Sequence, residues 1–150
     1  IAAMQAVHCT SDGPWVPDRL GEERSAEGAY VWRKLLDSGA RILNGTDAPV
    51  EDLSPIANFY ATVTRQDPSG QPPGGFDPDQ RLTRQEALRT MTLDAAYGSF
   101  EEDSKGSIEA GKLADLIVLS QDILSVPEED ILKTEVLATI VAGCRVGTMT

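Results

Sequence analysis

The sequence predicts an α/β fold, because segments typical of strands and of helices alternate in its first half. An apolar run at residues 1–7 and a shorter one at 40–44 have the pattern of buried strands, and a helical segment separates them. Polar residues follow each of the two strands directly. This order is used by a βα-barrel and by an open α/β sheet, and in both the chemistry lies at the C-terminal ends of the strands.

The segment between the two strands is expected to be helical. Residues 13–17 break regular structure, after which Ser25 is placed to cap a helix that runs to about Ser38. Apolar residues at helical spacing give this helix one buried face, which includes Trp32, and Gly39 is a natural stop. Trp32 is therefore expected in the core.

Local signals also define the next part of the chain. A helix is expected at 54–64, while the tract 67–75 is too rich in Pro and Gly for regular structure. That tract is either a solvated surface loop or a lid over the site. Thr83 and Glu86 have the spacing of a capping box, which opens a helix that continues to Tyr97.

The last third of the chain has the pattern of a small β-rich unit. The expected elements are a strand at 114–119, a short helix at 127–132 capped by Ser125, and strands at 136–142 and 145–150.

Composition limits the classes of function. With 150 residues, 41% of them hydrophobic, the chain has enough apolar material for one ordinary core or two small incomplete ones. The formal net charge of -11 repels polyanions, so neither nucleic acid nor an anionic membrane is an expected partner. The sequence shows neither a membrane-spanning run nor a secretory signal, which makes the cytoplasm the expected location. Because the chain opens on Ile1 and not on Met, it is expected to be cut from a longer protein.

The cysteine and histidine counts restrict disulfide and metal chemistry. Cys9 and Cys144 lie far apart and form no metal-spaced set, so both are expected to be reduced thiols. The chain has a single histidine, His8, and a zinc centre built wholly within it would need several converging ligands.

Asp47 is the first candidate for a functional residue. It follows the second strand in the sequence Gly-Thr-Asp-Ala-Pro, where Gly45 permits a tight backbone path and Pro49 stops an early helix, so the carboxylate is presented at a rim. The alternative is an aspartate that only forms a turn or caps a helix.

His8 and Asp12 follow the first strand and are expected to face the same rim as Asp47. His8 is placed to bind metal or a substrate oxygen, with Asp12 fixing its tautomer. The alternative is a satisfied buried histidine beside an ordinary loop. Trp15, in a proline-bounded loop after the strand, is a candidate for lining a substrate pocket.

Four motifs together resemble the amidohydrolase superfamily, and more narrowly its family 3, which contains N-substituted formamide deformylase-like enzymes. The motifs are Q-x-V-H-C-T-S-D-x-P-W, L-N-G-T-D-A-P-V, L-T-R-Q-E-A-L-R-T-M-T-L-D-A-A-Y and G-S-I-E-A-G-K-L-A-D-L-I-V-L-S. They occur in family order along nearly the whole chain, and the last is highly specific for the superfamily.

The resemblance implies the C-terminal part of a (β/α)8 TIM barrel joined to the C-terminal part of a small β-sandwich. Residues 1–8 match the seventh barrel strand and 40–44 the eighth, so that 1–104 belong to the barrel and 105–150 to the sandwich. It also implies a divalent metal, zinc, with Asp47 as both its ligand and the general base for the attacking water. His8 and Asp12 match the family's H-x-x-S-D motif after the seventh strand, which implies that they support the metal ligands or contact the substrate and are not primary ligands themselves.

The implied function is hydrolysis of a non-peptide C–N bond in a small linear amide. The family's H-x-H pair, its bridging carboxylate or carbamylated lysine and its later histidines have no counterpart in this sequence, so this piece alone is expected to be inactive. Incomplete sheets leave edges and apolar faces uncovered, and a homo-oligomer is therefore expected. The rival interpretation is an inactive α/β association module without a metal site.

Overall fold

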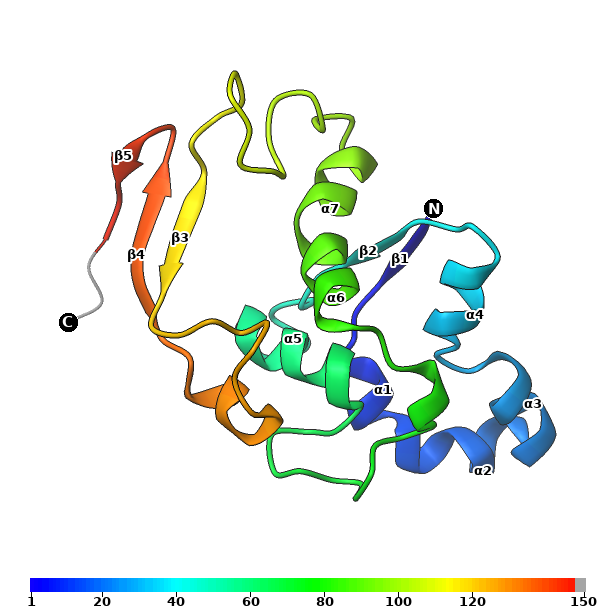
Figure 1. Ribbon diagram of the computed structural model, residues 1–150. Helices are drawn as coiled ribbons and strands as arrows, with labels where there is room; N and C mark the ends of the chain where they lie inside the picture. The colour runs from blue at the N-terminus through cyan, green and yellow to red at the C-terminus, as the bar shows by residue number, and fades with distance from the viewer. Residues whose placement is uncertain (148–150) are drawn as a thin grey trace.

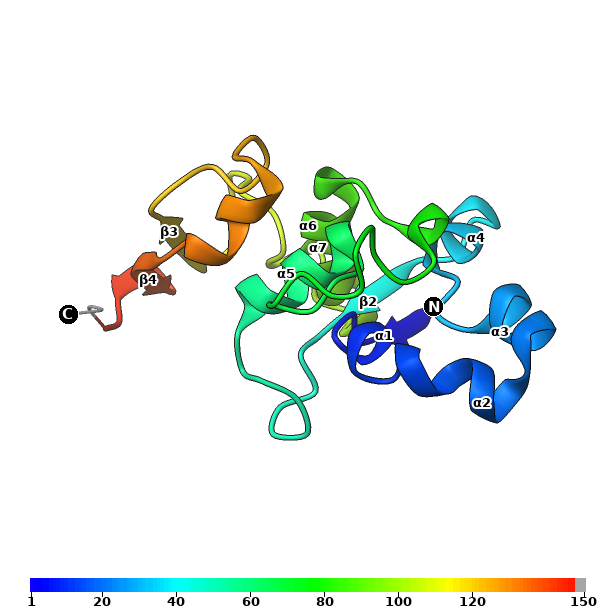
Figure 2. The same ribbon diagram turned by 90° about the horizontal axis from the view of Figure 1, so that it is seen from below.

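The computed structural model describes residues 1–147, which form a mixed α/β fold with two separate sheets. The strands β1 (Ala2–Met4) and β2 (Ile42–Asn44) pair in parallel, with Ala2 opposite Ile42 and Met4 opposite Asn44. The other sheet is antiparallel, in the order β3 (Leu116–Leu119), β4 (Val136–Val141) and β5 (Cys144–Arg145). In Figure 1 and in the turned view of Figure 2, helices lie between the two sheets.

Short helices connect the strands. Between β1 and β2 lie α1 (His8–Ser11), η1 (Gly13–Trp15), α2 (Val16–Leu20), α3 (Glu22–Gly28) and α4 (Trp32–Asp37). Between β2 and β3 lie α5 (Pro55–Thr64), η2 (Pro78–Gln80), α6 (Arg84–Met91) and α7 (Leu93–Gly98), and η3 (Glu128–Lys133) precedes β4. Among the described residues, no helix has the length and apolar character needed to cross a membrane.

Two helix starts match their sequence signals. The Ser54 hydroxyl accepts a hydrogen bond from the Ala57 N–H at 3.2 Å and caps α5. At α6 the capping box is complete, since the Glu86 N–H donates to the Thr83 hydroxyl and the Thr83 N–H donates to the Glu86 carboxylate. The predicted capping box at Thr83 and Glu86 is confirmed, because a cap depends only on residues within one turn.

The single helix expected from Ser25 to Ser38 is wrong. Ser25 lies inside α3, and the chain breaks at Tyr30, whose φ of 54° is left-handed, before α4 begins at Trp32. The break is held by a distant residue, because the Arg65 guanidinium donates to the Tyr30 carbonyl at 3.1 Å. A pattern of apolar spacing contains no information about that contact.

Three further predictions need correction. The first strand ends at Met4 instead of residue 7, and Ala3 is exposed, because α6 and α7 pack against β2 and not against β1. The helix expected from 83 to 97 is interrupted at Thr92, which has φ -123° and ψ -90° and separates α6 from α7. Ser125 does not cap the helix at 128–133: its hydroxyl donates to the Asp122 carboxylate at 2.8 Å.

At the C-terminal end the expected strand 145–150 is only partly represented. β5 covers Cys144–Arg145, residues 146–147 are not part of a strand, and residues 148–150 lie outside the described residues.

The core consists of two apolar clusters that share α5. The first lies against β1 and β2 and consists of Ala6, Cys9, Trp32, Ile42, Ala61 and Leu82. The second lies between α5, α6 and η3 and consists of Phe59, Tyr60, Val63, Ala87, Ile123 and Ile131. Trp32 is 2% exposed, which confirms its expected place in the core. Because α5 contributes to both clusters, it connects the ends of the parallel strands to the rest of the chain.

Candidate active site

The parallel pairing of β1 and β2 brings the residues after both strands to the same edge of the sheet. His8 is the first residue of α1, directly after β1, and Asp47 follows β2. Nε2 of His8 lies 3.3 Å from Oδ2 of Asp47. The two side chains are 26% and 41% exposed, so a small molecule can reach both. The structure therefore brings His8 and Asp47 together at one edge of the β1–β2 sheet, where the sequence predicted that both would lie.

The backbone of Asp47 is in a left-handed conformation, with φ of 58°. The Val50 N–H donates to the Asp47 carbonyl at 2.9 Å and closes a turn that aims the carboxylate back toward β1. Aspartate tolerates this conformation better than most residues with a side chain. The tight path was expected at Gly45, but Asp47 itself carries the left-handed angle.

A second contact joins the two segments that follow the strands. The Ser11 hydroxyl donates to Oε1 of Glu51 at 2.7 Å. Ser11 ends α1, and Glu51 lies in the turn after Asp47. Two contacts therefore join the segment after β1 to the segment after β2: the His8–Asp47 pair and the Ser11–Glu51 pair.

Asp12 has a different role from the one expected. Its Oδ2 accepts a hydrogen bond from the Tyr30 hydroxyl at 2.6 Å, and the carboxylate beside His8 is that of Asp47. Burial and, after it, the bond to Asp12 raise the pKa of Tyr30 well above its usual range. The expectation that Asp12 fixes the tautomer of His8 is therefore wrong, because Asp12 lies at the end of α1, where it faces the Tyr30 turn.

Trp15 lies on the outside of the same segment. Its indole N–H donates to the Ser11 carbonyl at 3.1 Å, and the residue is 59% exposed. A contact between Trp15 and a substrate stays a prediction.

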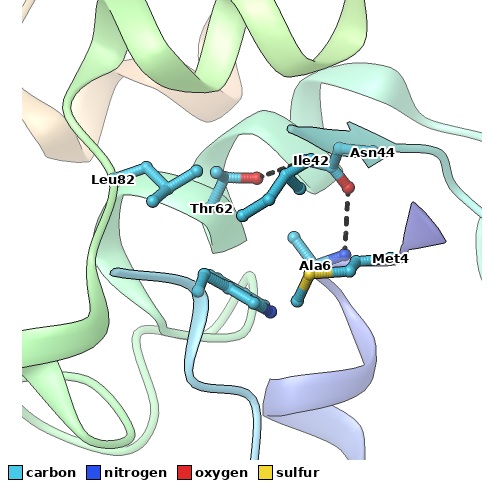
Figure 3. Close-up of a pocket in the computed structure, with 7 residues that line it drawn as sticks. Met4, Ala6, Ile42, Asn44, Thr62 and Leu82 are labelled. Carbon is cyan, nitrogen blue, oxygen red and sulfur yellow. Dashed lines mark hydrogen bonds between the residues drawn. The ribbon is translucent and has the colours of Figure 1, made fainter. Parts of the chain in front are cut away.

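Beneath the rim lies a buried polar network that sequence reasoning missed. Oδ1 of Asn44 accepts from the Ala6 N–H at 3.1 Å and from the Asn58 amide at 3.0 Å. The Asn44 amide donates to the Thr62 hydroxyl at 2.8 Å, and Oδ1 of Asn58 accepts from the Val7 N–H at 3.3 Å. Figure 3 shows the Asn44 bonds to Ala6 and Thr62 beside a cavity of about 10 Å³. The available signal was an asparagine inside the apolar helix 55–64.

The donor set at the rim fits part of a metal centre. A histidine nitrogen and an aspartate oxygen are ordinary zinc ligands, and a zinc site uses three or four protein ligands. Within residues 1–147, no group of three or more His, Cys, Asp and Glu side chains lies close enough to hold an ion. Asp47 and His8 can therefore supply two ligands and require others.

A cavity much larger than the one beneath the rim lies elsewhere. It measures about 780 Å³, is mostly apolar, and lies between α5 and α7 on one side and β3 on the other. Its walls include neither His8 nor Asp47. This cavity is therefore separate from the His8–Asp47 pair.

Comparison with known proteins gives consistent matches. The sequence matches the amidohydrolase family over residues 1–146. It is 32% identical over 143 residues to the protein LONG AFTER FAR-RED 3 of Arabidopsis thaliana, which covers 95% of this chain and 24% of the relative. It is 34% identical over 123 residues to the N-substituted formamide deformylase of Arthrobacter pascens, with 82% of this chain and 22% of the relative covered.

Solved structures agree with the sequence matches. An uncharacterized metal-dependent hydrolase from Pyrococcus horikoshii OT3 superposes with a TM-score of 0.72 at 31% identity, over 84% of this chain and 25% of the other. The chain thus spans about a quarter of the proteins it matches.

Proposed function

This chain belongs to the amidohydrolase family, and on that premise we propose that it forms part of a metal-dependent hydrolase with Asp47 as metal ligand and general base. The observation that carries the proposal is the approach of the Asp47 carboxylate to His8, 3.3 Å away, at the C-terminal ends of two parallel strands. In βα-folds this edge is where chemistry takes place. The matched solved structure of a metal-dependent hydrolase supports the class of reaction.

We propose that the substrate is a small molecule with a non-peptide amide C–N bond. The support is the name of the Arthrobacter pascens relative, an N-substituted formamide deformylase. Asp47 would hold a divalent metal such as zinc together with ligands from outside this chain, and that metal would supply a water activated near neutral pH and a Lewis acid for the scissile carbonyl.

The chain's own residues have distinct parts in this proposal. One oxygen of the Asp47 carboxylate accepts the proton of the attacking water, while His8 fixes the orientation of the carboxylate through Oδ2. Proton transfer needs a distance near 2.6 to 3.2 Å, so a carboxylate held at one oxygen reacts with less rearrangement. Asp12 and Trp15 lie on the same segment as His8 and are proposed to contact the substrate.

The proposed fold of the complete site follows from the same premise. β1 and β2 are proposed as the seventh and eighth strands of a barrel, with residues 1–104 as its last part. Residues 105–150 are proposed as the C-terminal share of a β-sandwich, which the β3–β4–β5 sheet supports.

The experiment measures zinc binding to the 150-residue chain by equilibrium dialysis. Asp47→Asn is compared with Asp12→Asn, because each variant removes one negative charge from the same rim. We expect Asp47→Asn to weaken zinc binding about tenfold or more and Asp12→Asn to leave it nearly unchanged. Equal weakening of zinc binding in the two variants would refute Asp47 as a ligand and favour the inactive association module. Hydrolysis of formamides, linear amides and dipeptides by the hydrolase of which we propose the chain forms part then tests the substrate class.

A further inference from the structure

Two buried asparagines lie at the point where β1 and β2 separate. The last ladder contact is the Gly45 N–H donating to the Met4 carbonyl at 3.1 Å. Beyond this contact, the segment after β1 turns into α1, which begins with His8. The segment after β2 turns toward Asp47. Asn44 is 9% exposed and Asn58 is 0% exposed.

The amide side chains replace the bonds that the strand gives up. α1 begins after Val7, whose apolar side chain cannot cap a helix. The N–H groups of Ala6 and Val7 instead donate to the Asn44 and Asn58 side chains, which come from β2 and α5. A buried N–H without an acceptor is costly, so these bonds select the backbone path that leads to His8.

The Thr62 hydroxyl sets the direction of the Asn44 amide. Its proton is donated to the Asn58 carbonyl at 2.7 Å, so its oxygen is left to accept from the Asn44 amide nitrogen. With its nitrogen directed at Thr62, the Asn44 side chain presents its oxygen to Ala6. A leucine could fill the same volume as either asparagine, whereas only an amide donates and accepts in this pattern.

We propose that Asn44, Asn58 and Thr62 are the positioning residues of the His8–Asp47 pair. The network holds the segment after β1 at the two residues just before His8: Ala6 bonds to Asn44 on the strand that leads to Asp47, and Val7 bonds to Asn58 on α5. The distance between the imidazole and the carboxylate is thereby set by buried groups that lie below the rim. A role of these three residues in catalysis rests on the proposed function. Their role in positioning His8 beside Asp47 does not.

Thr64 provides a matched control for Thr62. Both threonines lie on α5, are at most 1% exposed, and donate to a carbonyl one turn back, Thr64 to Tyr60 at 2.8 Å. Each also accepts one further bond: Thr62 from Asn44 and Thr64 from the Gln66 N–H. Thr62→Val and Thr64→Val therefore make the same chemical change in the same helix, and only the first reaches the network.

The test is nuclear magnetic resonance on the metal-free 150-residue chain. His8 is the only histidine, so its ring signals are unique. Loss of one net hydrogen bond corresponds to about five- to tenfold in local opening. We expect Thr62→Val to speed exchange of the Ala6 and Val7 amides about tenfold more than Thr64→Val does, and to shift the His8 ring signals. Thr62→Ser keeps the hydroxyl and is expected to behave like the parent chain.

Three outcomes would overturn the inference. These are equal amide exchange in Thr62→Val and Thr64→Val, unchanged His8 ring signals in Thr62→Val, or a Thr62→Ser spectrum in which the His8 signals are displaced. The serine comparison remains decisive if the valine variant does not fold. Because no metal is present, failure of Asp47 to bind zinc would refute the proposed function without changing these results.

Discussion

Glu86 offers a prediction about stability and pH that rests on a single well-defined contact. Its carboxylate accepts from both terminal nitrogens of Arg33 and from the Thr83 N–H, so it joins the start of α6 to α4. The bond to Arg33, more than the contacts with Thr83, lowers the pKa of Glu86 from its usual 4.5 to about 2, against the opposing effect of burial.

The size of the effect follows from this change in pKa. A fall from 4.5 to about 2 corresponds to about 3 kcal/mol at most. Because the Glu86 side chain is 34% exposed, solvent screening reduces the usable part to about 1 to 2 kcal/mol. Since the pKa of a carboxyl is depressed by folding, the stabilisation is complete above pH 4.5 and is lost as the pH falls toward 2.

The test compares Glu86→Gln with the parent chain in urea unfolding at pH 7 and pH 3. A glutamine oxygen can still accept from the Thr83 N–H, so the variant isolates the pair with Arg33. We expect a loss of about 1 to 2 kcal/mol at pH 7 and a smaller difference at pH 3. Glu101→Gln is the control, because the exposed Glu101–Lys105 pair should contribute under about 0.5 kcal/mol. A difference between parent and Glu86→Gln that is the same at both pH values would refute the reasoning.

Three other predictions concern the core and the surface. Burial raises the pKa of the Cys9 thiol to about 12, so at pH 8 iodoacetamide should label only the exposed Cys144, giving one adduct by mass spectrometry and a second adduct in urea. Arg65→Lys should lower the free energy of unfolding by about 2 to 4 kcal/mol in urea titrations, because lysine lacks the planar fork that stacks on Trp32 and binds the Tyr30 carbonyl; no change would contradict this. Ile117 shares an exposed apolar face of β3 and β4 with Leu137 and Val141, so sedimentation should show association that Ile117→Lys reduces, and a monodisperse parent monomer would contradict it.

The parts of the fold that were predicted correctly are those with local causes. Ser54 caps α5 and Thr83 caps α6 through contacts within one helical turn, which a sequence displays directly. The parallel strands were identified from apolar runs, and their pairing follows from the helices that separate them. The helix 25–38 was wrong because its break at Tyr30 depends on Arg65, which lies 35 residues away.

In the candidate site, too, the features that follow from the order of elements were predicted and the individual side-chain contacts were not. That His8 and Asp47 follow two neighbouring parallel strands could be inferred from the order of elements, and the structure places them 3.3 Å apart. That Asp47 and not Asp12 is the partner of His8 could not, because α1 turns Asp12 toward Tyr30. The sequence suggests a residue pair at a strand end more reliably than it suggests which partner each side chain contacts.

Asn44 shows why a site of this kind needs a polar group in its core. As the last residue of β2, it occupies a position where an apolar side chain would pack against Ala6 and Trp32 without loss of volume. Two parallel strands that separate toward a rim leave N–H groups without ladder partners, and apolar packing cannot supply acceptors for them. An asparagine at the fork supplies the acceptor from the second strand itself, so the geometry of the rim depends on the strand that carries Asp47. The geometry of the His8–Asp47 pair and the stability of the core are therefore coupled at this residue.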